Sequence, residues 1–157
     1  MTYTEDALVE QPAINLFSEL NWDTVTCWDE IFGSLDDANL ADNPLFFGRE
    51  TRNDVVLFAR LKAALLKLNP DVSKLIIQEA IDEIARDRSA MTPIAANEEV
   101  YGLLTNGYVY ITNAEDEDDC VVRYVDWSSA CNNDFLLCSQ MSISGEIETR
   151  RPDLIGF

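Results

Sequence analysis

The feature that most constrains the fold is a change of hydrophobic period near Asn106-Gly107. Before this point, three successive segments repeat apolar residues every three or four positions, which is the period of an amphipathic helix. After it, apolar and polar residues alternate with a period of two, as they do in strands. Helices first and then a mainly antiparallel or mixed sheet predict the α+β class.

We expect the three helices over residues 53–69, 71–87 and 92–106. Asn53 begins the first as an N-cap and Pro70 stops it, while the third begins with a threonine cap followed by proline. A glycine follows the end of the third helix, as is typical of helix C-termini. The residues predicted to face the core are Phe58, Leu61, Leu65 and Leu68 in the first helix, and Ile77, Ala80, Ile81 and Ile84 in the second.

The alternating segments after residue 106 predict a hairpin and two further strands. "GYVYIT" and "CVVRYVDW" pair across the acidic turn "NAEDEDD". The run Glu115 to Asp119 lacks the glycine and the distant glutamate of a calcium loop, so we interpret it as a solvated hairpin tip. "NDFLLCSQMSISGEIE" predicts one long strand with Leu137, Met141 and Ile143 on one face, and "DLIGF" opens another strand.

Before the three helices, the chain predicts one more helix and a short extended piece. The helix covers about Glu5 to Asn21, and Pro12 either kinks it or lies in its first turn. Extended residues carrying Trp22, Val25 and Trp28 follow, and residues 33–50 form a loop rich in turn residues. No basic residues interleave with the aromatic ones of "WDEIF" and "LFF", so we expect these clusters to pack in the core or between domains rather than to stack on bases.

Composition limits the class of protein. A chain of 157 residues with 47% hydrophobic residues is long enough for one domain with a real core. No apolar run reaches the length of a membrane span and the N-terminus is acidic, so we expect no signal peptide and a cytoplasmic location. Four cysteines without a C-x-x-C pair predict reduced, mostly buried thiols: Cys27, Cys120, Cys131 and Cys138.

The residues available for chemistry are few. The chain has no histidine, which excludes Ser-His-Asp and Cys-His catalysis and H-E-x-x-H metalloprotease chemistry. Its six glycines form neither a G-x-G-x-x-G nor a P-loop motif. The formal net charge is −18, and ten acidic residues precede Arg49, the first basic one. Such a surface repels free DNA, because phosphate binding requires Lys and Arg.

Several segments, in this order, resemble a known family: "EDALVEQPAINLFSELNW", "FGRETRNDVVLFARLKAALLKLNP", "RDRSAM", "AANEEVYGLL", "NNDFLLCSQMSISGE" and "RRPDLIGF". Together they are similar to the N-terminal region of the restriction subunit of type I restriction-modification enzymes. The resemblance covers nearly the whole chain, from about Glu5 to Phe157. It implies a restriction-endonuclease-like PD-(D/E)xK core, here a partial N-terminal nuclease domain over residues 1–157, incomplete at the C-terminus, with its helical part at about 4–106 and its sheet part at 107–157.

The same resemblance implies a catalytic site. In this family the aspartate of "PD" begins a strand and an "E-x-K" follows on the adjacent strand, so Asp153 corresponds to the first catalytic carboxylate and a ligand of Mg²⁺. No counterpart of the second carboxylate and the lysine follows before Phe157. One carboxylate with waters holds magnesium weakly, so we expect the isolated chain to be inactive.

Other charged residues have two interpretations. Arg150 and Arg151 either contact DNA phosphate beside the active site or are solvated charges at a strand edge. Many nucleases of this fold have an accessory metal-site glutamate on the first helix, and Glu5 or Glu10 is a candidate for it. The alternative is that both are ordinary surface carboxylates. We assign no role to Glu146 and Glu148.

The resemblance implies that the complete subunit cleaves foreign DNA with Mg²⁺ and uses ATP through motor domains absent from this chain. Its partners would be DNA and the methyltransferase and specificity subunits, with no membrane. The net charge and the missing half of the catalytic motif leave a second hypothesis. In that alternative the chain is a non-catalytic acidic interaction module, a remnant or a DNA mimic, that binds a restriction-modification partner.

Overall fold

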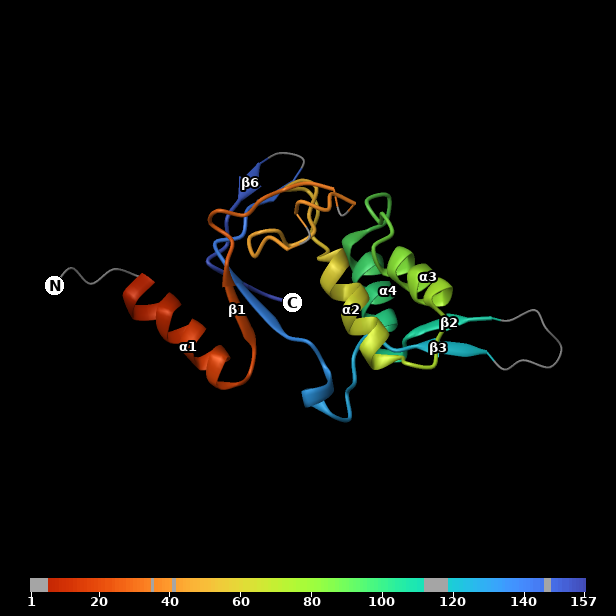
Figure 1. Ribbon diagram of the computed structural model, residues 1–157. Coiled ribbons are helices and arrows are strands. Elements are labelled where there is room, and N and C mark those ends of the chain that lie inside the picture. Colours follow the sequence, from red (N-terminus) through yellow and green to blue (C-terminus); the bar gives the residue numbers. More distant parts are fainter. Residues whose placement is uncertain (1–5, 35, 41, 112–118, 146–147) are drawn as a thin grey trace. The chain divides into compact units, whose positions relative to one another are not determined.

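The computed structural model describes residues 6–34, 36–40, 42–111, 119–145 and 148–157, and it has the predicted α+β class (Figure 1). The chain forms two compact units. The terminal unit combines Met1–Leu57 with Asp134–Phe157, and the central unit is the continuous segment Phe58–Asn133. Within the described ranges, no helix is long and apolar enough to cross a membrane.

The terminal unit begins with a π-helical turn over Asp6–Glu10 that leads into α1, Gln11–Glu19. Pro12 lies in the first turn of α1, where a missing N–H removes no bond from the helix interior. The N–H of Leu20 donates to the carbonyl groups of Leu16 and Phe17 and closes the helix. The predicted first helix is therefore confirmed, while its expected start at Glu5 lies outside the described residues.

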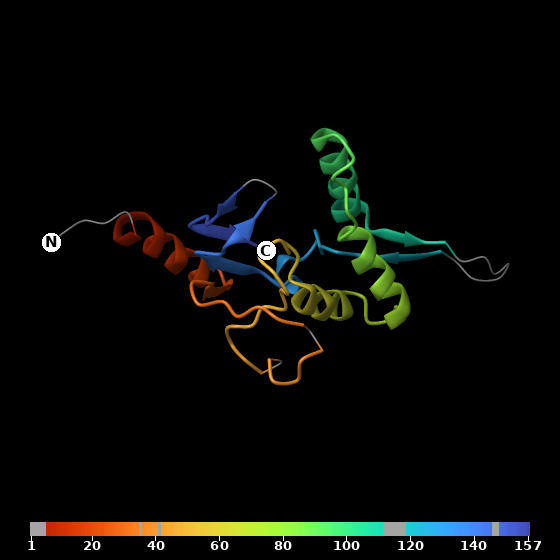
Figure 2. The ribbon, with the colours of Figure 1, turned by 90° about the horizontal axis from the view of Figure 1, so that it is seen from above.

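A three-stranded mixed sheet forms the centre of the terminal unit, with the order β1-β4-β7. β1 pairs with β4 in parallel and β4 pairs with β7 in antiparallel, so Cys138 lies between Val25 and Ile155. A separate antiparallel pair, β5 with β6, connects β4 to β7 along the chain. Figure 2 shows these strands from above. Their bounds are β1 Asp23–Thr26, β4 Leu136–Ser139, β5 Ile143–Ser144, β6 Thr149–Arg150 and β7 Leu154–Gly156.

The single long strand predicted from residue 133 to residue 148 is wrong. The backbone of Gln140 has a φ of 59°, which is the left-handed region, and this conformation ends β4 and separates it from β5. An L-residue adopts this conformation at a cost of roughly 1–3 kcal/mol unless its surroundings hold it there. The strand predicted from "DLIGF" is confirmed as β7.

The core of the terminal unit combines residues from both of its chain segments. Its buried members are Cys27, Leu57, Leu136, Cys138 and Met141. The thiol of Cys27 forms a hydrogen bond with that of Cys138, and this bond, with burial, raises the pKa of Cys27. The cysteines are free, as predicted. Burial is confirmed for these two, whereas Cys131 is exposed.

The central unit contains three helices, one hairpin and a 3-10 turn. α3 packs against both α2 and the hairpin strands β2 and β3 (Figures 1 and 2). The hydroxyl groups of Ser73 and Thr92 accept the N–H groups of Ile76 and Ala95, which caps α3 and α4. The elements are α2 Phe58–Leu68, α3 Lys74–Ile84, α4 Pro93–Asn106, β2 Tyr108–Tyr110, β3 Cys120–Val122 and the 3-10 turn Ala130–Asn132.

The predicted helices and hairpin of the central unit are confirmed, except that β3 ends at Val122 instead of residue 127 and that α2 starts later than predicted. That helix begins at Phe58 instead of Asn53. The reason is local: the carboxylate of Asp54 accepts the backbone N–H groups of Glu50 and Thr51 at 2.9 and 2.8 Å, which holds this segment in a turn. Most of the acidic run from Glu115 to Asp119 lies outside the described residues.

The core of the central unit lies among α2, α3 and β3. The amide of Asn69, at the end of α2, donates to the carbonyl groups of Leu65 and Arg123 at 2.9 Å and accepts the N–H of Arg123 at 2.8 Å. These bonds fix the segment after β3 to the end of α2. The buried core residues are Leu65, Ile77, Ala80, Ile81, Val122 and Tyr124.

Candidate functional site

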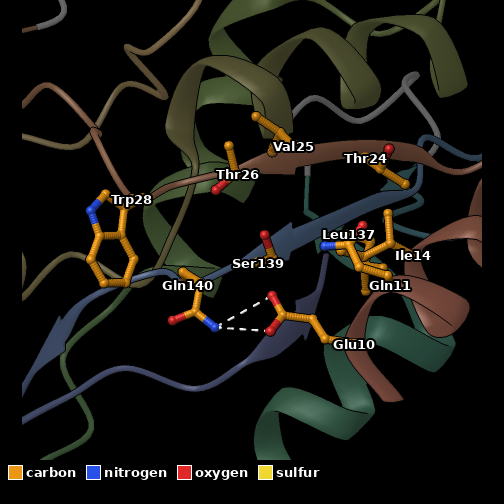
Figure 3. A pocket seen from close by; sticks show the side chains of 10 residues that line it. All are labelled: Glu10, Gln11, Ile14, Thr24, Val25, Thr26, Trp28, Leu137, Ser139 and Gln140. Carbon is orange, nitrogen blue, oxygen red and sulfur yellow. Dashed lines mark hydrogen bonds between the residues drawn. The ribbon is translucent and has the colours of Figure 1, made fainter. Parts of the chain in front are cut away.

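A pocket of about 620 Å³ lies in the terminal unit (Figure 3). Its walls come from three parts of the unit: the π-helical turn with the first half of α1, the strand β1 with the residues just after it, and the end of β4. Most of the side chains that line it are polar, and they include one carboxylate and one tryptophan. The lining residues are Glu10, Gln11, Ile14, Thr24, Val25, Thr26, Trp28, Leu137, Ser139 and Gln140.

The side chain of Gln140 connects two carboxylates at this pocket. Its Nε2 donates to Glu10 Oε1 and Oε2 at 3.3 and 3.2 Å, drawn as dashed lines in Figure 3, and to Asp153 Oδ1 at 3.2 Å. One nitrogen therefore lies within hydrogen-bonding distance of both acids.

Strand pairing explains why Gln140 and Asp153 meet. Ser139 pairs with Leu154 in the antiparallel register of β4 and β7, so the next residue of one strand faces the preceding residue of the other. The N–H of Gln140 donates to the carbonyl of Asp153 at 3.0 Å and extends this pairing by one bond. Asp153 thus lies immediately before β7, where the resemblance predicted a strand-initiating aspartate.

Of the two helix glutamates considered from the sequence, Glu10 faces this cluster, while Glu5 lies outside the described residues. Glu10 is the last residue of the π-helical turn before α1. Sequence reasoning missed Gln140. Gln140 meets Asp153 through the register of β4 against β7, and the local periodicity of the sequence does not reveal a register between distant strands.

The two arginines before Asp153 have different surroundings. Arg150 donates to Glu148 at 2.8 Å, and its side chain is 78% exposed. Arg151 donates from Nε to the hydroxyl of Ser142 at 3.0 Å, and its guanidinium carbon lies 4.3 Å from the centre of the Trp28 ring. The structure therefore connects Arg151, and not Arg150, to a residue that lines the pocket.

Trp28 does not lie in the core, which was one of the two packing positions predicted for the "WDEIF" aromatic residues. It is 60% exposed, and the basic residue over its ring comes from the far end of the chain. A local search for interleaved basic residues could not find this pair, because the two residues lie far apart in the sequence and meet only in the fold. Phe32, in the same cluster, has Arg49 over its ring at 5.4 Å.

A buried ion pair supports the segment that carries Arg151 and Asp153. Arg49 has no exposed surface, and its Nη1 lies 2.9 Å from Glu30 Oε2. Its Nη2 donates to the carbonyl of Ser142 at 2.7 Å, while the hydroxyl of Ser142 accepts from Arg151. Arg49 Nε and Glu30 Oε1 are buried without a hydrogen-bond partner. Arg49 thus fixes Ser142, which in turn positions Arg151.

A smaller pocket of about 230 Å³ lies in the central unit, between the end of α4 and the segment after β3. Its acid, Asp126, has a pKa lowered by hydrogen bonds from the Asn132 side chain and from the backbone N–H groups of Ser128 and Ser129. Those bonds close the turn around Asp126, so its carboxylate has a structural role. The larger pocket is the better candidate site.

No group of three or more His, Cys, Asp or Glu side chains that could hold a metal ion occurs in the described part of the chain. The donor set is smaller: Glu10 and the amide of Gln140 line the pocket, and Asp153 lies beside it, bonded to Gln140. Mg²⁺ prefers oxygen ligands, keeps several waters and often binds proteins through only one or two carboxylates. Glu10 and Asp153 therefore fit a weak magnesium site by their chemistry.

The fold and this pocket define an α+β protein in which a glutamate before a helix and an aspartate before a sheet strand both bond to one glutamine. A family model described as "Type I restriction enzyme R protein N terminus" matches residues 2–157. The chain belongs to this family, and the R subunit is a component of a restriction-modification complex. Neither the curated proteins nor the solved structures include a match to the chain.

Proposed function

We propose that the chain is the nuclease portion of a type I restriction subunit and that its pocket is the metal site of a PD-(D/E)xK core. The observation that carries this proposal is the convergence of Glu10 and Asp153 on the amide of Gln140. In the proposal, Asp153 is the catalytic carboxylate and first metal ligand. The nuclease domain spans residues 1–157 as far as this chain extends.

Glu10 and Asp153 would hold the ion, with waters completing its coordination. Rotation of the Gln140 amide would turn its oxygen toward a cation and its nitrogen away, so this residue can adapt to either state of the site. When bound, Mg²⁺ polarises phosphoryl oxygens and lowers the pKa of a coordinated water. Glu10 and Asp153 would hold the ion next to the scissile phosphate and would orient the waters around it.

Arg151 would bind a DNA phosphate next to the metal. Its Nε bond to Ser142 and its stacking on Trp28 fix the guanidinium, and a fixed guanidinium loses less entropy when it binds an anion. Arg150 would contribute less, because Glu148 already neutralises it. This ranking refines the earlier expectation, which treated the two arginines alike.

The family pattern also has a second carboxylate and a lysine after the "PD" aspartate, and residues 154–157 contain neither. We therefore expect this chain to bind metal without cleaving DNA. In the complete subunit, ATP would act through motor domains, and the methyltransferase and specificity subunits would supply the assembly in which DNA is bound. The proposed location is the cytoplasm.

Terbium luminescence tests the metal site, because Tb³⁺ prefers the same oxygen ligands and the nearby Trp28 can sensitise its emission. We expect Asp153→Asn and Glu10→Gln to weaken Tb³⁺ binding at least about tenfold, the loss that even outer-shell changes cause at metal sites. Mg²⁺ should displace Tb³⁺ from this site. Glu148→Gln is the matched control, since Glu148 is an exposed acid paired with Arg150.

Unchanged Tb³⁺ affinity in both pocket variants would contradict the proposal. It would favour the alternative of an acidic interaction module, which the net charge of −18 supports. Trp28→Phe tests whether Trp28 is the residue that sensitises the Tb³⁺ emission. This variant should lose the sensitised emission while calorimetry shows the same affinity.

A further inference from the structure

We infer that Trp28 and Arg151 form a binding site for an unpaired nucleotide of a single DNA strand. The Trp28 ring would stack on the base, and the guanidinium of Arg151 would bind the adjacent phosphate. This inference rests on the proposed function, because it names the form of DNA that the pocket receives.

The first observation is the position of Trp28. The side chain is 60% exposed, follows β1 directly and lines the 620 Å³ pocket. Figure 3 shows its ring at one end of the pocket, on the side of Gln140. Stacking of a base on an aromatic ring is the main sequence-tolerant contact by which proteins bind single strands. An exposed ring at the rim of a polar pocket is suited to that contact.

The second observation is the state of Arg151. Its Nε is bound to Ser142 and its guanidinium lies over the Trp28 ring. Among the described residues, neither of its Nη nitrogens has a hydrogen-bond acceptor. A cation that stacks on the ring and still has free donors combines the two groups needed for one nucleotide, an aromatic surface and a phosphate ligand.

The other tryptophans show that this combination is specific to Trp28. Trp22 lies between Phe17 and Phe135, at centroid distances of 4.9 and 4.8 Å. Trp127 is 68% exposed, but its Nε1 donates to the carbonyl of Leu104. Among the tryptophans, all of which lie within the described ranges, only Trp28 has an arginine over its ring.

The pocket walls supply groups for the edge of a base. Thr24, Thr26 and Ser139 line the pocket with hydroxyl groups, and Gln140 lines it with an amide. Its volume lies within the range of roughly 300–1,000 Å³ that is usual for small-ligand sites. Hydroxyl and amide groups both donate and accept, so they match the edges of any base and predict little sequence preference.

The charge of the protein favours a single strand over a duplex. Affinity for duplex DNA comes mainly from neutralising phosphates, and a chain with net charge −18 repels a duplex at long range. Bases inside a duplex stack on each other and offer no free face to Trp28. A single strand offers unstacked bases, so short-range stacking can provide affinity that long-range charge does not.

The test measures binding of a fluorescently labelled oligothymidylate, and of a duplex of equal length, to the 157-residue chain in EDTA. We expect the chain to bind the single strand more tightly than the duplex. Trp28→Leu, which keeps apolar bulk without an aromatic face, should weaken single-strand binding about fivefold to a hundredfold, the range expected for stacking on one base. Trp28→Phe should retain part of the affinity. Arg151→Ala should weaken binding and reduce the salt slope by about one.

Trp127→Leu and Arg52→Ala are the matched controls, because Trp127 is more exposed than Trp28, Arg52 is an exposed arginine over the Phe32 ring, and neither lines the pocket. Both controls should bind like the wild type. Equal affinity for duplex and single strand, unchanged affinity in Trp28→Leu, or no binding at all would overturn the inference. Asp153→Asn should lose Tb³⁺ binding but keep oligonucleotide binding in EDTA. Failure of this inference is therefore distinguishable from failure of the proposed metal site.

Discussion

The terminal and central units differ in how their cores are assembled. The central unit uses one continuous segment, and its buried residues come from periodic helices and the strand that follows them. The terminal unit joins two segments, and its core places Cys27 and Leu57 beside Leu136 and Met141. Local pattern therefore specifies one unit, while long-range pairing specifies the other, which also holds the candidate site.

Their buried polar residues differ in the same way. Asn69 in the central unit uses both donors and its acceptor on backbone groups. Arg49 in the terminal unit is a buried charge with one unsatisfied nitrogen, and its partner Glu30 has one unsatisfied oxygen. An amide with all of its hydrogen bonds made stabilises the fold without leaving a buried charge. A buried ion pair, in contrast, strongly destabilises the fold when either partner is removed.

The largest effect should come from removing the buried cation. In Arg49→Met the carboxylate of Glu30 remains 2% exposed without its partner, and we expect a loss of about 3–5 kcal/mol in the free energy of unfolding. Urea unfolding, followed by tryptophan fluorescence in a Trp127→Phe background, would report the terminal unit. Circular dichroism of the helices would report mainly the central unit, and its transition should move less.

The double variant Arg49→Met with Glu30→Met is the control for this prediction. Because both charges are then absent, most of the lost stability should return. A double variant as unstable as the single one would show that packing around Arg49, and not its charge, accounts for the effect.

A core deletion in the central unit should have the next largest effect. Ile77→Ala removes a fully buried side chain from α3, and such changes cost about 2–5 kcal/mol. Leu75→Ala, on the same helix but 68% exposed, should change stability by less than about 0.5 kcal/mol. Equal losses in the two variants, measured by urea unfolding, would mean that the core is not where the structure places it.

The smallest effect concerns pH. Burial raises the pKa of Glu30 above its ordinary value of 4.5, and the charge of Arg49 only partly opposes this. The folded state thus keeps the proton at pH values where the unfolded chain has lost it, so ionisation of Glu30 lowers stability as pH rises above 4.5. Each unit of pKa difference between the folded and the unfolded state changes the free energy of unfolding by up to about 1.4 kcal/mol.

Glu30→Gln removes this contribution and keeps the size of the side chain. The stability of Glu30→Gln relative to the wild type should therefore increase as pH rises above 4.5, and then level off. Thermal unfolding of both proteins across this range measures the difference. A relative stability that falls with pH would contradict the sign of the pKa shift.

Sequence reasoning succeeded where the determinants are local. Ser73 and Thr92 cap helices whose apolar stripes the period already indicated, and Gly107 ends α4 with a φ of 84°. It failed at Asn53, because the competing turn depends on the Asp54 carboxylate, and at Gln140, whose left-handed backbone leaves no periodic trace.

The candidate site shows the same division. The family resemblance singled out Asp153, and its local context was enough for that. Choosing Glu10 as its partner, and recognising Gln140 and the stacking of Trp28 with Arg151, required strand registers and contacts between distant segments. Such contacts depend on the whole fold and are not encoded by the neighbours of each residue.

The split arrangement of the terminal unit has a consequence for biosynthesis. A ribosome makes β1 early, yet its partner β4 comes more than a hundred residues later, after the entire central unit. At typical elongation rates this delay is on the order of ten seconds. Throughout that time the nascent chain carries an unpaired strand, and the central unit can fold first. Slow codons or chaperone contacts within residues 58–133 would therefore act on the assembly of a pocket to which those residues contribute no wall.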